Sequence, residues 1–139
     1  MVGNKRDAAR AARGELDLVA TGGDRCVFRS GDTVYKVERN PTHGRWANAS
    51  EHCNAVRFAG CPNIPPTTLY LPDGMTVLAM PFYSGEVDPF PEGTPEILAL
   101  RARFGTDVTN VNTRRDSDGG LWIVDFPNLV TPASDCAEP

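Results

Sequence analysis

Apolar and polar positions alternate along two neighbouring segments near the start of the chain, Cys26–Arg29 and Thr33–Val37. A period of two residues is typical of a β-strand with one buried face. Ser30, Gly31 and Asp32 lie between the two segments, and these residue types favour tight turns. The pattern therefore predicts an antiparallel hairpin.

Three other segments have the composition or spacing of helices. Lys5–Glu15 is rich in alanine and charged residues, which favours a surface helix. Residues 45–60 repeat apolar side chains at helical spacing up to a terminal glycine, which predicts a helix of about four turns. Pro95–Phe104 is the third predicted helix. Thr94 suits its N-cap, and Gly105 suits its end.

Turn residues between short apolar segments indicate two further hairpins. Residues 67–71 and 76–80 flank a Pro-Asp-Gly turn at 72–74, and residues 117–120 form a second turn before the apolar segment 121–124. The predicted order is helix, two strands, helix, two strands, helix and hairpin. This order predicts an α+β fold with antiparallel pairing.

Length and charge limit the classes of function. A chain of 139 residues can bury a core of its own, so residues 1–139 are expected to form a single domain. The 14 Lys and Arg residues are outnumbered by 18 Asp and Glu residues, which indicates no general affinity for nucleic acid. The start of the chain lacks the apolar core of a signal peptide, and no apolar run approaches the roughly 18 residues that span a bilayer. A cytoplasmic protein without a nucleic-acid or membrane partner is therefore expected.

The four cysteines, Cys26, Cys53, Cys61 and Cys136, contain no C-x-x-C pair, and only two histidines accompany them. This pattern does not favour a zinc site. Nothing at the N-terminus indicates an oxidising compartment, in which disulfides persist. We therefore expect four thiols in the core or on the surface.

Three polar residues near the end of the chain are of the types that hold metal-bound phosphates. Asn112 follows Asp107 by five residues, and Asp125 ends the apolar segment 121–124. Carboxylate and amide oxygens suit Mg²⁺, and phosphoryl transfer also needs a carboxylate that orients the nucleophile. A polar loop would explain Asp107 and Asn112 equally well, because both residue types satisfy loop backbone. Asp125 is harder to explain in this way, since it interrupts an apolar strand.

A lysine in a predicted strand and a glutamate in a predicted helix precede these residues. Lys36 lies in the predicted strand Thr33–Val37, downstream of Gly22 and Gly23, and Glu51 lies in the next predicted helix. Taken alone, Lys36 would be an outward-facing strand residue and Glu51 a solvated helix residue. Their order along the chain, together with the polar residues downstream, is much more specific than any one of them.

This order resembles the protein-kinase-like superfamily, which includes the aminoglycoside kinases, and especially the small kinase-like proteins of bacteria and their phages. The resemblance covers roughly residues 21–126. It implies a truncated kinase-like fold, with an N-lobe-like part at 20–82 that contains a five-stranded antiparallel sheet and a helix. Residues 83–129 would form a reduced C-lobe with the catalytic hairpin, after an N-terminal helix in 1–19 and before a tail at 130–139.

The resemblance also implies a role for each polar residue. Lys36 would pair with Glu51 and steady the phosphates of ATP. Asp107 would orient the acceptor hydroxyl. Asn112 and Asp125 would hold Mg²⁺.

A nucleotide pocket is implied by the same resemblance. Gly22 and Gly23 would lie in a phosphate-covering loop ahead of Val27, which would also contact the nucleotide, and Met80 and Phe82 would lie beside the adenine. ATP and Mg²⁺ are therefore the expected cofactors.

The chain departs from the family pattern in its second part. Phe-Gly-Thr precedes Asp107 where His-Arg is usual, and Pro127 replaces the glycine of D-F-G. Between Pro81 and Asp107 there is room for only a loop and one helix. The chain then lacks a helical platform for a protein substrate, which favours a small molecule, the protein itself or a neighbouring copy as phosphate acceptor.

Three hypotheses about function follow. The first is a minimal kinase-like protein that binds Mg-ATP, and the second is a pseudokinase that regulates a host or partner protein without catalysis. The third is a small α+β interaction domain in which the motif order is coincidence. Asn48, one turn before Glu51, is either a surface polar group or a helper to Glu51. Trp46 and Trp122 are expected to be packing residues, because no basic stripe surrounds them.

Overall fold

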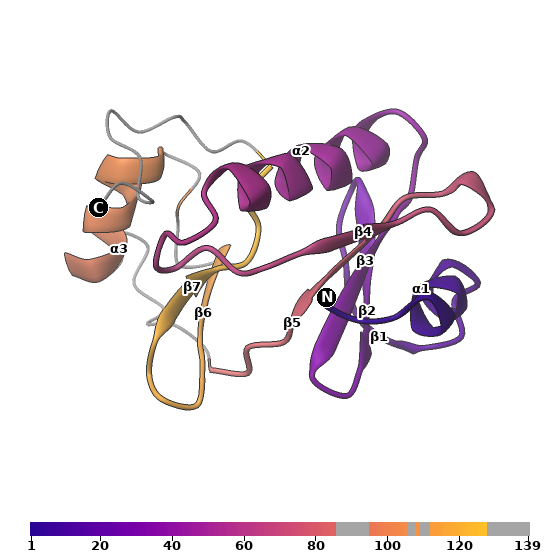
Figure 1. Ribbon diagram of the computed structural model, residues 1–139, viewed down its shortest axis with the longest axis horizontal. Coiled ribbons are helices and arrows are strands. Elements are labelled where there is room, and N and C mark those ends of the chain that lie inside the picture. Colours follow the sequence, from indigo (N-terminus) through magenta and orange to yellow (C-terminus); the bar gives the residue numbers. More distant parts are fainter. Residues whose placement is uncertain (86–94, 106–107, 109–111, 128–139) are drawn as a thin grey trace.

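The computed structural model describes residues 1–85, 95–105, 108 and 112–127. In these residues the chain is an α+β protein with three α-helices, one 3-10 helix, a five-stranded antiparallel sheet and a two-stranded sheet (Figure 1). The large sheet has the strand order β1-β2-β3-β5-β4. Its strands are β1 (Asp17–Thr21), β2 (Arg25–Ser30), β3 (Thr33–Glu38), β4 (Thr68–Tyr70) and β5 (Val77–Pro81).

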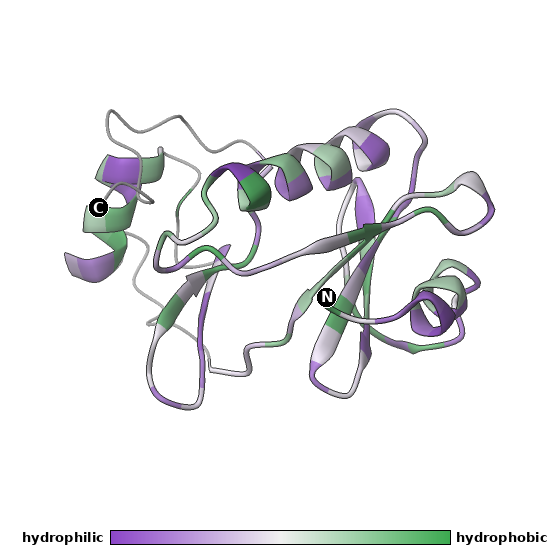
Figure 2. Ribbon diagram, viewed as in Figure 1, coloured by the Kyte–Doolittle hydropathy of each residue, from purple (hydrophilic) through white to green (hydrophobic). Residues whose placement is uncertain are grey.

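Helices α1 (Lys5–Ala12) and α2 (His43–Arg57) pack against opposite faces of this sheet. Strand β3 shows why, because successive side chains of a strand point to opposite faces. Tyr35 and Val37 lie in a core cluster with two alanines of α1, whereas Val34 lies in the cluster beneath α2. Figure 2 shows hydrophobic residues concentrated in the central strands and in β7.

The predicted hairpins of the large sheet are confirmed. Strands β2 and β3 pair from Ser30 with Thr33 onward, across a turn in which Gly31 has a φ of 59°. Strands β4 and β5 also pair antiparallel, and the 3-10 helix η1 (Pro72–Gly74) forms their turn.

Strand β1 was not predicted from the alternation of residues. It pairs with β2, but it is an edge strand and all five of its residues are exposed. The burial pattern with a period of two, on which a strand prediction depends, is therefore absent. A bulge between Leu18 and Ala20 further disturbs its register.

Two helices end earlier in the sequence than predicted. Helix α1 ends at Ala12 and not at Glu15, and Gly14 follows with a φ of 70°, which takes the chain out of the helical conformation. Helix α2 ends at Arg57, three residues before Gly60. Helix α3 (Pro95–Phe104) has the predicted bounds, and Thr94 lies outside the described residues.

The last hairpin lies beside the large sheet (Figure 1). Its strands, β6 (Thr113–Arg115) and β7 (Leu121–Ile123), pair antiparallel across the predicted turn. A bridge between Gly85 and Arg115 ties it to the segment that follows β5. The apolar side chains of β7 and α3 join those beneath α2 in one cluster, so the hairpin shares its core with the sheet.

The prediction of four thiols was wrong. Cys26 and Cys53 are free, but the buried Cys61 is disulfide-bonded. Sequence spacing does not show which cysteines the fold brings together, and this is what a disulfide requires. Among the described residues, no helix has the length and apolar character needed to cross a membrane.

Candidate functional site

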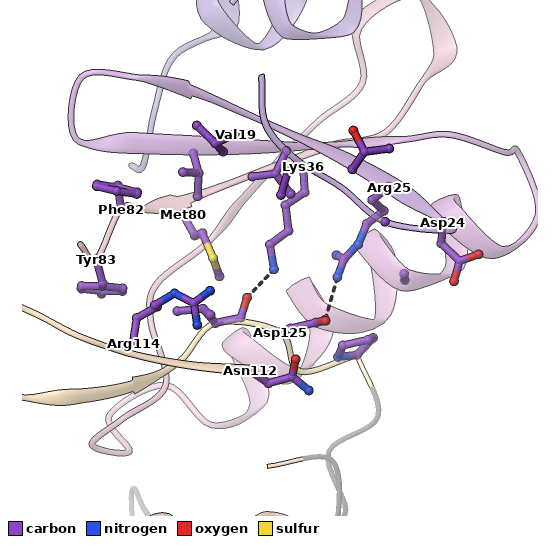
Figure 3. A pocket seen from close by; sticks show the side chains of 18 of the residues that line it. Val19, Asp24, Arg25, Lys36, Met80, Phe82, Tyr83, Asn112, Arg114 and Asp125 are labelled. Atoms are coloured by element: carbon purple, nitrogen blue, oxygen red, sulfur yellow. Dashed lines mark hydrogen bonds and ion pairs between the residues drawn. The ribbon is translucent and has the colours of Figure 1, made fainter. Parts of the chain in front are cut away.

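A cavity of about 600 Å³ lies between the large sheet and the segment that follows β7 (Figure 3). Most of the residues predicted for the nucleotide and metal site line it. They are Gly22, Gly23, Val27, Lys36, Met80, Phe82, Asn112 and Asp125. Glu51 is fully buried behind this lining, and Asp107 lies outside the described residues.

The glycine turn between β1 and β2 forms one wall of the cavity. The amide of Gly22 donates a hydrogen bond of 2.8 Å to the carbonyl of Arg25, which closes the turn. Arg39 donates to the Gly22 carbonyl over 2.7 Å and braces the turn from outside. A Cβ built on Gly23 would meet nothing within 4 Å, so steric crowding does not explain a glycine at this position.

Lys36 points from β3 toward α2 and pairs with Glu51. Its Nζ lies 2.7 Å from Oε2 of Glu51, and it also donates to the backbone carbonyl of Val124. The lysine side chain is only 7 % exposed and that of the glutamate 0 %. Burial lowers the pKa of Lys36, and the nearby Glu51 carboxylate opposes this shift. Lys36 is therefore not an outward-facing strand residue, and Glu51 is not a solvated helix residue.

Glu51 accepts hydrogen bonds from three separate parts of the chain. Besides Lys36, its carboxylate accepts from Arg25 and from the backbone amide of Phe126, both over 3.1 Å. The side chain thus joins β2, β3 and the segment after β7. A buried carboxylate requires such partners, because desolvation without them is costly.

Asn48 is fully buried and supports the same cluster. Its Nδ2 donates to the carbonyl of Lys36 over 3.0 Å and to the carbonyl and hydroxyl of Thr76. Its Oδ1 accepts a hydrogen bond of 3.2 Å from Nη1 of Arg25. The interpretation of Asn48 as a surface polar group was therefore wrong. The helper interpretation holds indirectly, because Asn48 hydrogen-bonds to Arg25, which in turn donates to Glu51.

Helix α2 fixes the position of the backbone on both sides of Phe126. Ser50 donates to the carbonyl of Pro127 over 2.6 Å, and Asn54 donates to the carbonyl of Phe126 over 2.7 Å. With the bond from the Phe126 amide to Glu51, three side chains of α2 bind two consecutive residues. Asp125 directly precedes them, so its backbone position is set by α2.

Arg25 was missed by the sequence analysis, although it is central to the site. Its Nη2 lies 2.8 Å from Oδ1 of Asp125 and 3.1 Å from Oε1 of Glu51, so one nitrogen joins two carboxylates. Figure 3 shows Arg25 and Lys36 pointing toward the Asp125 segment. Alternation along the strand could have indicated Arg25, because Arg25 and Val27 lie on the same face of β2 and Val27 pairs directly with Lys36.

Aromatic residues lie at the end of the cavity beside β5. The side chain of Arg29 lies 3.7 Å from the centroid of the Phe82 ring. Tyr83 stacks on Trp122 with ring centroids 5.0 Å apart, and the Trp122 indole donates to Asp116 over 2.8 Å. Burial raises the pKa of Tyr83 to about 12. Trp122 is therefore a packing residue, as predicted.

Trp46 is not a packing residue, which corrects the prediction. It is 52 % exposed and lines the cavity from α2. It lies four residues before Ser50, one helical turn away on the same row of α2. An exposed tryptophan is thus placed at the end of the cavity near the Asp125 segment.

The residues present suit Mg²⁺ only when a ligand brings phosphates. The Asp125 side chain is 46 % exposed and Asn112 lines the same cavity, so the lining includes one carboxylate and one amide. The described residues contain no group of three or more acidic, histidine or cysteine side chains placed to hold an ion. Mg²⁺ commonly binds through one or two carboxylates together with substrate phosphates, which matches this set.

No protein-family model matches the chain, and no curated protein matches it either.

Proposed function

We propose that this chain is a minimal kinase-like protein that binds Mg-ATP in the cavity between the glycine turn, Lys36 and Asp125. The observation that carries the proposal is the ion pair of Lys36 and Glu51, with N and O atoms 2.7 Å apart at the wall of the cavity. The order of these residues in the sequence resembles that of the protein-kinase-like superfamily.

The burial of the Lys36 ammonium supports a binding role. Removing a lysine and a glutamate from water is costly, and a buried ion pair adds little net stability on average. Here the pair is held by additional donors from Arg25 and the Phe126 amide. A cation kept desolvated at a cavity wall is well suited to an anionic ligand, because its interaction with charge is stronger there than in water.

The cavity supplies complementary surfaces for the rest of the nucleotide. Val27 and Met80 provide apolar lining, and Phe82 and Tyr83 lie at the end of β5. In the proposal these residues flank the base, while the turn at Gly22 lies over the phosphates. Lys36 steadies the phosphates, and Asp125 and Asn112 hold Mg²⁺, which neutralises phosphate charge.

The acceptor in this proposal is a small molecule, the protein itself or a neighbouring copy. The segment between Pro81 and Asp107 is too short for a docking platform that receives a protein substrate. In the transfer, the acceptor hydroxyl forms a bond to the terminal phosphorus while the bond from that phosphorus to the bridging oxygen breaks. ADP leaves, and the hydroxyl proton passes to the carboxylate that orients the hydroxyl, which the resemblance identifies as that of Asp107.

A second candidate function is that of a pseudokinase, which binds and regulates a partner protein without catalysis. One observation favours it. Asp125, the proposed metal ligand, already has a cation from the protein itself, because Arg25 lies 2.8 Å from its Oδ1. A site whose charges are satisfied internally can keep its shape without a nucleotide.

Calorimetric titration with Mg-ATP tests the first function. We expect binding in the micromolar-to-millimolar range for the natural sequence, and weaker binding for Lys36→Ala and Asp125→Asn. Lys5→Ala is the matched control, because Lys5 is the only other lysine and is exposed on α1. Asp118→Asn is the control for the carboxylate, since Asp118 lies in the exposed turn of the hairpin. No heat at millimolar nucleotide from folded protein would exclude this function and favour the second.

A further inference from the structure

The guanidinium of Arg25 is anchored on one side of the site and reaches across to the other. Nη1 donates to Asn48 over 3.2 Å and Nη2 donates to Glu51 over 3.1 Å, and both acceptors are fully buried. Nη2 also donates to Asp125 over 2.8 Å. The Arg25 side chain is 10 % exposed, whereas that of Asp125 is 46 % exposed. In the pair of Arg25 and Asp125, it is therefore the Asp125 side chain that can turn toward solvent.

The charges of this cluster cancel. Two cations, Arg25 and Lys36, face two carboxylates, Glu51 and Asp125, within contact distances of 3.1 Å or less. A divalent cation bound to Asp125 would therefore lie close to a guanidinium that already uses the same carboxylate. Like charges at such separations repel, and the repulsion grows where water is excluded.

We propose that Arg25 and a divalent metal ion compete for Asp125, so that Arg25 sets how strongly nucleotide binding depends on metal. This inference rests on the proposed function, because it concerns the same nucleotide site. The metal enters only when Asp125 turns away from Arg25. Asn48 and Glu51 hold Arg25 in place, so the guanidinium remains beside the cavity after the exchange. Arg25 is thus a positioning residue for the metal-binding carboxylate.

The competition has a measurable signature in ADP binding. The ratio of ADP affinity with Mg²⁺ to ADP affinity with EDTA reports the contribution of the metal. Arg25→Met removes the charge and keeps much of the side-chain volume, so Asp125 becomes available to the metal without prior release. We expect this ratio to rise on the order of tenfold, because a hydrogen bond to a charged group contributes at least about 1.5 kcal/mol, which is roughly that factor in affinity. A purely structural role would weaken binding equally in both conditions and leave the ratio unchanged.

Calorimetry on the full chain, with ADP as the probe, tests the inference. The ratio is measured for the natural sequence, Arg25→Met and Arg25→Lys, and for Arg25→Met combined with Asp125→Asn. Arg6→Met, an exposed arginine on α1, is the matched control. If Arg25→Met does not fold, Arg25→Lys carries the test. Lysine keeps the charge but lacks the planar fork with which the guanidinium holds Asn48 and the two carboxylates at once, so a rise of a few fold is expected.

The outcomes separate this inference from the proposed function. A ratio that rises in Arg25→Met, but does not rise when Asp125→Asn is also present, supports the competition. Bound ADP with an unchanged or lower ratio in both arginine variants would overturn this inference alone. An equal rise in the Asp125→Asn background would also overturn it, since the effect would not act through Asp125. Absence of ADP binding by the natural sequence and every variant would overturn the proposed function, and this inference with it.

Discussion

Lys36 and Glu51, separated by 15 residues in the sequence, form a 2.7 Å ion pair from which water is almost excluded. Strand β3 supplies the lysine and helix α2 supplies the glutamate, so the pair also fixes the helix against the sheet. The Lys36 ammonium reaches the Val124 carbonyl as well, which links both elements to the segment that carries Asp125. The pair therefore holds the helix against the sheet and also forms part of the cavity wall.

Glu51→Gln is predicted to destabilise the protein strongly. The amide keeps the shape of the carboxylate but leaves the buried Lys36 ammonium without its countercharge. Removing one partner of a buried ion pair costs about 3 kcal/mol or more, because the remaining charge is desolvated and uncompensated. Urea denaturation would measure the loss.

The double variant Lys36→Met with Glu51→Met is predicted to be more stable than Glu51→Gln. Replacing both charges by apolar groups of similar size removes the desolvation penalty of the pair together with its attraction, and Arg25 keeps Asp125 as its countercharge. A double variant that is less stable than Glu51→Gln would contradict this account.

Stability in alkaline solution is predicted to depend on Tyr83. Burial raises the pKa of its phenol to about 12 from a usual value of 10.0. Between these values the unfolded chain releases the phenolic proton while the folded protein keeps it, so stability falls as the pH rises. Tyr83→Phe keeps the stacking on Trp122 and should lose less stability between pH 10 and pH 12.

Urea unfolding at several pH values would measure this difference. Lys36 acts in the opposite direction, because its pKa is lowered, so that the unfolded chain binds the proton more readily and stability rises with pH. Comparison of Tyr83→Phe with the natural sequence cancels that contribution. Identical slopes for the two proteins would show that the folded state does not retain the Tyr83 proton.

Local signals predicted much of the fold. Each of these signals spans only a few residues: the alternation in β2 and β3, the proline and glycine at the ends of α3, and the turn residues of the hairpins. Strand β1 was not predicted from its residues, because an edge strand with every residue exposed has no alternating burial. The resemblance to a known family implied five strands, but the residues of β1 did not indicate the strand by themselves.

The candidate site could be predicted only in part, because some of its residues are recognised by their order along the chain and others only by their packing. Lys36, Glu51 and Asp125 were found from their order along the chain, and the structure brings them to one cluster. Arg25 and Asn48 were missed or left open because their roles depend on packing between β2 and α2. Helix α2 has no single apolar face that would have indicated which of its polar residues are buried, and Asn48 and Glu51 both are.

Ser50→Ala and Asn54→Ala are predicted to loosen the segment that follows Asp125. Each variant removes a hydrogen bond from α2 to the carbonyl of Phe126 or Pro127, with a loss of about 1 kcal/mol. Hydrogen exchange at the Phe126 amide should become faster in both variants. Ser117→Ala, in the exposed turn of the hairpin, is the control and should leave this amide unchanged. Unchanged exchange in Asn54→Ala would mean that the bond from the Phe126 amide to Glu51 holds the segment alone.

Trp46 is predicted to report ligand binding by fluorescence. It is 52 % exposed and lines the cavity, whereas Trp122 is stacked on Tyr83 and hydrogen-bonded to Asp116. In Trp122→Phe, emission comes from Trp46 alone, and saturating Mg-ATP should change its intensity and reduce its quenching by iodide. The matched variant Trp46→Phe, which retains only the partly buried Trp122, should respond less to iodide with or without nucleotide. If calorimetry shows binding while Trp46 emission and quenching stay constant, the nucleotide does not extend to the α2 end of the cavity.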